Sequence, residues 1–200
     1  MKFSRVLIGL LVFWSAAGAV AQRTIYRNRQ YGIFLPVPSG TLACIPPVYK
    51  GNGADHGPQI LLGTDDATLC AKSSGKRYIN VFASYTVTEE EKTLHGNLEM
   101  ACEFEVNRAC SPAPAGLHIK GMKTEAGRLD RSDGSIEIIL VTMAGKPAPD
   151  FDASVPSINY SLSLNTDKQH LDEDLTAFRA MLKTIKIAPA SHSRILGPTA

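Results

Sequence analysis

The sequence predicts a single α+β domain in which a mostly antiparallel sheet is packed by two helices. Short apolar or alternating segments recur along the chain and end at Gly, Pro, Asn or Asp, as strands separated by turns do. Two longer segments place apolar residues at helical spacing, each after a run of acids. The order is three strands, a helix, several strands and a second helix, which indicates an α+β sandwich.

Six segments have the pattern of strands: residues 31–38, 59–63, 77–85, 117–125, 135–143 and 158–164. The first stops at Pro36 and Pro38, because proline cannot donate to a sheet ladder. After Glu137 both faces of the fifth segment are mostly apolar, which predicts a central strand covered on both sides. The sixth is expected to be half-buried, because one face is apolar and the other is polar. Its apolar face holds Tyr160, Leu162 and Leu164, and its polar face holds Ser161 and Ser163.

The first predicted helix begins at Thr88, whose hydroxyl can cap free backbone N–H groups while Glu91 stands at the reciprocal capping-box position. Its apolar face consists of Leu94, Leu98 and either Ala101 or Cys102. A short strand around Phe104 and Val106 is expected to follow. The second helix spans Asp172–Ile185, with acids at its start and lysines at its end, as the helix dipole favours.

Residues 1–21 have the organisation of a cleavable signal peptide. Lys2 and Arg5 supply a positive start, residues 6–17 are apolar, and Ala19 and Ala21 are the small residues of a cleavage site. We expect cleavage after Ala21 and a periplasmic or secreted protein. A membrane anchor is the alternative, but the apolar run is shorter than the roughly 20 residues that span a bilayer. The expected parts are then a lead-in segment 22–30, a domain 31–188 and a flexible tail 189–200.

The charge of the mature domain is expected to be close to zero. The chain has 21 Lys and Arg and 19 Asp and Glu residues, and two of the basic residues lie in the leader. A neutral domain has no general attraction for phosphate backbones, so nucleic acid is not an expected partner. No later segment is long and apolar enough to span, so no membrane insertion is expected after cleavage.

All four cysteines follow the leader: Cys44, Cys70, Cys102 and Cys110. An even number in an exported chain is typical of disulfides. Three pairings are possible, and Cys44–Cys70 with Cys102–Cys110 is favoured because each closes a local loop without crossing the other. The chain-entropy model assigns such loops roughly 3.6 and 2.6 kcal/mol. A structural zinc site usually shows a close pair of cysteines, and none is present, so no metal or other cofactor is expected.

Three segments resemble the Mog1/PsbP-like group of small domains. They are Tyr31-Gly-Ile-Phe-Leu-Pro-Val-Pro, the strand 78–85 that runs into the Thr88 helix, and Tyr160-Ser-Leu-Ser-Leu followed by Phe178-Arg-Ala-Met-Leu-Lys-Thr-Ile. The resemblance covers much of residues 31–187, and the four cysteines and the loop 44–58 depart from it. The group has no shared active site, so the resemblance implies a fold and a tendency to bind other proteins, not a reaction.

No catalytic motif is present: the chain has no H-E-x-x-H, no G-x-S-x-G, no P-loop and no G-x-G-x-x-G. The candidate binding residues are Asp55, His56 and Gly57, in a glycine-rich loop enclosed by the expected Cys44–Cys70 disulfide, where loops often present binding groups. A turn, in which Asp55 caps a bend and His56 is solvated, explains the same residues more simply. Asp130, Asp133 and Gly134 lack the spacing of a calcium loop and are expected in a hairpin turn.

The sequence therefore favours a non-enzymatic protein of the bacterial envelope that binds another envelope or secreted protein through its loops or sheet face. An immunity or inhibitor protein is one concrete form. Two alternatives stay open. One is a secreted hydrolase that uses Asp55 and His56 with an acid such as Asp65, and the other is a small-ligand carrier with a cavity between sheet and helices. Under the leading hypothesis, substitutions in the loop 51–58 weaken binding and leave thermal stability nearly unchanged.

Overall fold

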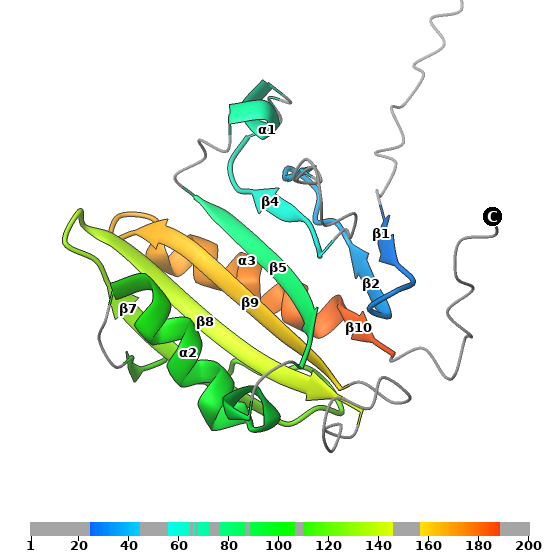
Figure 1. The fold of residues 1–200 in the computed structure, drawn as a ribbon. Coiled ribbons are helices and arrows are strands. Elements are labelled where there is room, and N and C mark those ends of the chain that lie inside the picture. Colours follow the sequence, from blue (N-terminus) through cyan, green and yellow to red (C-terminus); the bar gives the residue numbers. More distant parts are fainter. Residues whose placement is uncertain are drawn as a thin grey trace, which may run out of the picture.

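A seven-stranded antiparallel sheet forms the centre of the structure, a computed structural model (Figure 1). Residues 25–44, 56–64, 66, 68–72, 77–86, 89–106, 110–145 and 157–188 are described. In spatial order the strands are β3 (Leu42–Cys44), β4 (Gln59–Leu61), β5 (Tyr78–Tyr85), β9 (Ile158–Asp167), β8 (Ser135–Ala144), β7 (Thr124–Asp130) and β6 (Ser111–Pro112). The long strands β5, β9 and β8 lie side by side, so β9 is central in the sheet.

A smaller three-stranded sheet is built from segments at the two ends of the described chain. Its order is β1 (Ile25–Asn28), β2 (Ile33–Pro36) and β10 (Lys186–Ile187), all antiparallel. Part of the expected lead-in segment 22–30 is therefore β1. The expectation of a mere lead-in overlooked that Tyr26 is buried in the core, at 7% exposed. A short strand with few apolar residues is stabilised by its pairing with β2 and gives little local signal.

The two long helices cover opposite faces of the large sheet (Figure 1). Helix α3 (Leu171–Thr184) packs its apolar stripe into the main core, against β9 and β2. Helix α2 (Leu94–Val106) lies mainly over β7 and β8. Its residues Leu94, Leu98, Ala101 and Cys102 form a second cluster with Leu129, Ile139 and Val141. The α+β class, the antiparallel sheet and the predicted face of the first helix are thus found.

The start of the first helix was predicted wrongly. Thr88 lies outside the described residues, and Glu90–Lys92 form a separate 3₁₀ turn, η1, before α2 begins at Leu94. The cap is Thr93, whose Oγ1 accepts a hydrogen bond from the backbone N–H of Gly96 at 2.9 Å. Thr88 and Thr93 are both suitable capping residues, and the packing of Leu94 and Leu98 on the sheet decides between them.

Two strand predictions also need correction. Helix α2 continues to Val106, where a short strand around Phe104 was expected. The predicted strand 117–125 is irregular up to residue 123, and only its last two residues belong to β7, which spans Thr124–Asp130 and so extends into the turn-rich stretch expected after residue 125. Leu117 and Ile119 contact the core without joining the ladder. An apolar pattern indicates that side chains are buried, but a buried segment need not be a strand.

Two disulfides are present, with the connectivity favoured from the sequence. Cys44 joins Cys70 of the short helix α1 (Thr68–Lys72), and Cys102 joins Cys110. The second links α2 to the residues just before β6. Gly127 on β7 makes room for it, because a Cβ there would lie 2.5 Å from the Cβ of Cys110. Disulfides of this kind are typical of oxidising compartments. No helix in the described part of the chain is both long and apolar enough to cross a membrane.

Candidate functional site

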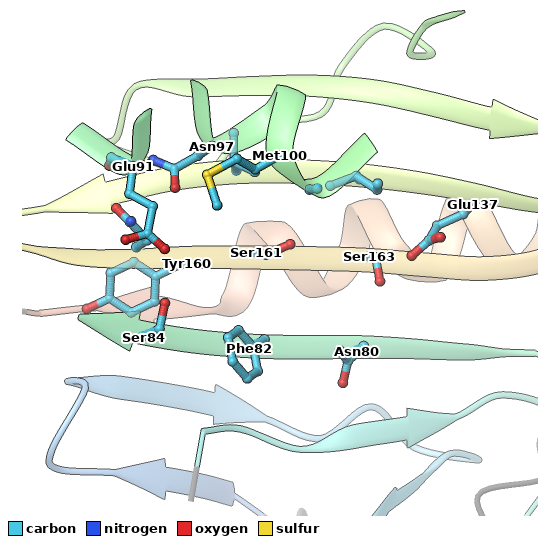
Figure 2. A pocket seen from close by; sticks show the side chains of 14 residues that line it. Asn80, Phe82, Ser84, Glu91, Asn97, Met100, Glu137, Tyr160, Ser161 and Ser163 are labelled. Carbon is cyan, nitrogen blue, oxygen red and sulfur yellow. Dashed lines mark hydrogen bonds between the residues drawn. The ribbon is translucent and has the colours of Figure 1, made fainter. Parts of the chain in front are cut away.

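The described residues cover only about half of the sheet face that carries α2, and a groove lies over the remaining half. Helix α2 covers β7 and β8, so the neighbouring strands β9 and β5 form an open floor beside it. The resulting hollow, here called the β9 groove, has a volume of about 500 Å³. This volume lies within the usual range for small-ligand sites. Figure 2 shows it running along β9, with α2 on one side and β5 on the other.

Small polar side chains make the floor of the β9 groove. Asn159, Ser161 and Ser163 alternate along β9 with Tyr160 and Leu162, which belong to the main core. The register sets Asn159 opposite Ser84, Ser161 opposite Phe82, and Ser163 opposite Asn80 on β5. On the other side Ser161 pairs with Val141 and Ser163 with Ile139. A central strand therefore has one apolar face and one face of amides and hydroxyls.

The two sides of the groove carry exposed apolar side chains. Phe82 on β5 is 42% exposed and Met100 on α2 is 38% exposed. Ile25 is the only other large hydrophobic residue exposed to this degree in the described part of the chain. Phe82 and Met100 lie on opposite sides of Ser161 in the groove (Figure 2). Exposed apolar side chains that gather at a concave site are typical of ligand or partner binding.

Asn159 is the one residue of the described groove lining with an unmet hydrogen-bonding requirement. Its side chain is nearly buried, with 7% of the residue exposed, and neither Oδ1 nor Nδ2 has a hydrogen-bond partner. A buried polar group without a partner costs about 1–3 kcal/mol. Natural structures contain few such groups, and each one calls for an explanation. Both atoms are shielded from solvent, so a ligand that offers a donor and an acceptor at this end of the groove would supply the missing bonds once the side chain turns toward it.

The described residues that line the groove include acidic side chains but no Lys, Arg or His. Glu91 and Glu137 are its charged members, and Glu137 is paired with Arg131. Tyr160 adjoins the groove from the core side, where its hydroxyl donates to the backbone oxygen of Tyr31 at 2.6 Å. Burial raises the pKa of the Tyr160 phenol well above its ordinary value, and the neighbouring Tyr85 adds to this. The phenol therefore stays neutral and acts as a fixed hydrogen-bond donor.

The structure places two of the three predicted binding residues beside β5. Asp55 lies outside the described residues. His56 stands between two rings, with its centroid 5.5 Å from that of Tyr31 and 5.0 Å from that of Phe82. Its Nδ1 lies 2.7 Å from the carbonyl oxygen of Ala83. Because a carbonyl only accepts, Nδ1 is the protonated nitrogen. These contacts hold the ring of His56 in place behind Phe82, whereas a solvated turn residue was the simpler expectation.

Gly57 has a structural role that the sequence did not indicate. The segment 56–58 extends the β4 ladder along β5, because Ala83 N–H donates to His56 and Val81 N–H donates to Pro58. Gly57 is buried in this segment with φ +140, and a Cβ there would lie 2.0 Å from the carbonyl oxygen of Val81. Only glycine fits such a close approach. Whether the loop that precedes it binds a partner stays a prediction.

The other acids considered from the sequence serve turns and strands. Asp65 lies outside the described residues. Asp133 accepts hydrogen bonds from the backbone and hydroxyl of Ser135, which lower its pKa, and Gly134 has φ 85 in the same β7–β8 hairpin. Asp130 pairs with Arg128, whose hydrogen bond lowers the pKa of Asp130. Among the described residues no group of three His, Cys, Asp or Glu side chains is arranged to hold a metal.

The alternating pattern of the groove residues can be recognised in the sequence, but the sequence alone does not identify them as a binding site. The alternation of Ser161 and Ser163 with leucines predicts a half-buried strand whose polar face meets solvent. The central position of β9 is what changes this interpretation. The polar face of a central strand lies at the bottom of a layer of side chains, so Ser163 is only 8% exposed. The sequence therefore contains the alternation of serines and leucines, but it does not give the strand order that makes this polar face the floor of a groove.

Comparisons with known proteins give similarity of fold only. No protein-family model and no curated protein matches the chain. The structure of LpqN, described as involved in cell envelope biogenesis of Mycobacterium tuberculosis, is 14% identical with a TM-score of 0.48. That alignment covers 83% of this chain and 90% of LpqN. The cyanobacterial PsbP (CyanoP) of Synechocystis is 11% identical with a TM-score of 0.39, covering 88% of this chain and 99% of CyanoP. The weak resemblance to PsbP-like domains that the sequence suggested is thus confirmed at the level of the fold. Neither similarity supports an argument about function.

Proposed function

We propose that this chain is an exported, non-enzymatic binding protein of the bacterial envelope, and that its binding site is the β9 groove. The observation that carries the proposal is Asn159, a nearly buried amide without partners at the bottom of a groove flanked by exposed Phe82 and Met100. A protein that keeps an unsatisfied amide forfeits stability, and a ligand that completes its hydrogen bonds offsets that loss.

Catalysis is not part of the proposal, because the groove lining supports binding better than reaction. Its hydroxyls belong to serines on strands, its amides are asparagines, and Tyr160 is fixed as a neutral donor to Tyr31. A nucleophile needs a base within hydrogen-bond reach. No histidine is among the described residues that line the groove, and His56 lies behind Phe82 outside that lining.

Export is tested through the N-terminus of the mature protein. Expressed in a bacterium with a periplasm, the chain is expected in the periplasmic or external fraction with Gln22 as its first residue. Intact mass and N-terminal sequencing measure this. The variant Ala21→Arg places a large charged residue at the cleavage site and is expected to leave the leader attached. Recovery of the wild-type chain in the cytoplasm with Met1 in place contradicts export.

The binding site is tested by ligand-dependent stabilisation. The exported protein is screened by thermal unfolding against neutral oligosaccharides, peptides, fatty acids, nucleotides and polyamines. A ligand at a hundred times its Kd stabilises by about 2.7 kcal/mol. In a chain of this size, that corresponds to a rise in Tm of roughly 5–10 °C. We expect at least one class to raise Tm through the groove.

A matched pair of variants decides whether the groove is responsible. Ser161→Trp fills the centre of the groove, whereas Lys183→Trp places the same side chain at an exposed position on α3, which packs on the opposite face of the sheet. The stabilisation is expected to vanish in Ser161→Trp and to persist in Lys183→Trp. Equal stabilisation of both variants, or no stabilisation by any class, contradicts the proposed site.

A further inference from the structure

We infer that the ligand of the β9 groove is a neutral saccharide. This inference rests on the proposed function, and it names the ligand class from the chemistry of the lining. Three features of the groove argue against other classes of ligand, and two features match a sugar.

The backbone around the groove is unavailable for an added peptide strand. Strand β5 lies between β4 and β9, and β9 lies between β5 and β8, with continuous antiparallel pairing on each side. Addition of a strand needs an unpaired sheet edge. An extended peptide therefore finds no main-chain hydrogen bonds here.

The floor of the groove and its charges disfavour three further classes of ligand. An amphipathic helix docks into a groove that is apolar throughout, whereas the strand at the centre of this one presents Asn159, Ser161 and Ser163. The apolar lining residues lie on β5, β8 and α2 at its sides: Phe82, Ile139, Val141, Met100 and Ala101. Anionic ligands such as nucleotides need basic side chains. The charged residues among the described lining are the carboxylates Glu91 and Glu137. Glu137 is already paired with Arg131 and offers no uncompensated charge to a cation, and Glu91 is not without an interaction partner either.

The remaining lining matches the two chemical aspects of a sugar ring. Adjacent hydroxyls of a sugar each donate and accept, and the buried side-chain amide of Asn159, which has no hydrogen-bond partner, carries one acceptor and two donors that could meet them after the side chain turns toward the groove. Asn80, Ser84 and Ser163 extend this uncharged surface along the groove. The C–H face of a sugar ring is flat and apolar and packs on an aromatic ring. Phe82 supplies such a ring, exposed and braced from behind by His56.

The test is an NMR titration of the exported protein with maltotriose and with the trimer of N-acetylglucosamine. We expect one of them to shift backbone amides along β9 and β5 together with the Asn159 side-chain amide. Asn159→Leu is expected to abolish binding and to leave the Tm equal or higher, because it removes an unpaired buried amide. Phe82→Ala is expected to weaken binding about tenfold.

The control is Asn165→Leu, which makes the same change on the same face of β9, outside the groove lining. It is expected to bind like the wild type. Saccharide binding that survives in Asn159→Leu overturns the inference, as does the absence of binding to both trimers. If another class in the thermal screen binds through the groove, the inference fails and the proposed function stands. If no class binds, both fail.

Discussion

Replacing Arg77 by Met is expected to lower the free energy of unfolding by about 3–5 kcal/mol, as measured by urea denaturation. Arg77 directly precedes β5 and donates from Nε and Nη2 to the two carboxylate oxygens of Asp174, at 2.8 and 2.5 Å. Asp174 is 1% exposed in the first turn of α3 and also accepts from the hydroxyl of Thr166. Without Arg77, a buried carboxylate loses its cation, which is the costly case.

Two further variants identify the cause of this loss. Arg77→Met combined with Asp174→Leu removes both charges and is expected to recover much of the stability. Arg128→Met breaks the exposed pair with Asp130, whose side chains are 29% and 56% exposed, and should cost no more than about 1 kcal/mol. Equal losses in Arg77→Met and Arg128→Met would show that burial of Asp174 does not set the energy of this contact.

Gly57→Ala is expected to destabilise the protein by about 3 kcal/mol or more. The new Cβ would stand 2.0 Å from the carbonyl oxygen of Val81, and the backbone has φ +140 there. Backbone strain of this kind costs about 1–3 kcal/mol, and overpacking against β5 costs about 1–3 kcal/mol more. Thermal and urea unfolding measure the loss. This contrasts with the expectation from the sequence that changes in this loop leave stability unchanged.

Gly121→Ala serves as the matched control. Gly121 has φ +80, and no atom of the described residues lies within 4 Å of the place that a Cβ would take. The variant carries the backbone strain without the collision, so a smaller loss of about 1 kcal/mol is expected. If Gly57→Ala is no worse than Gly121→Ala, the segment 56–58 does not pack on β5 as the structure has it.

The sequence predicts well the elements that have a long buried face. Local sequence pattern and tertiary burial agree in four long elements: the strands β5, β8 and β9 and the helix α3. Each carries apolar residues on a buried face along most of its length. Strands β1 and β3 are short, and their existence depends on partners distant in the chain. Pairing of this kind leaves little trace in local composition.

The candidate site is harder to predict than the fold, for a specific reason. Asp55, His56 and Gly57 attract attention because their residue types are chemically versatile. Ser161 and Ser163 are ordinary residues whose meaning depends on strand order and on how far α2 extends over the sheet. Asn159 can be recognised only from its missing partners. Residue type alone identifies a reactive site more easily than a binding surface.

The disulfide between Cys102 and Cys110 gives the groove a dependence on the redox state of its surroundings. Helix α2 contributes Met100 and Asn97 to one wall, and this cross-link anchors its second half beside β7. In a reducing cytoplasm that anchor is absent, so we expect a precursor with a looser wall and weaker ligand capture. Under the proposed export and binding, oxidation after translocation would complete the wall, and the protein would acquire its affinity only outside the cytoplasm.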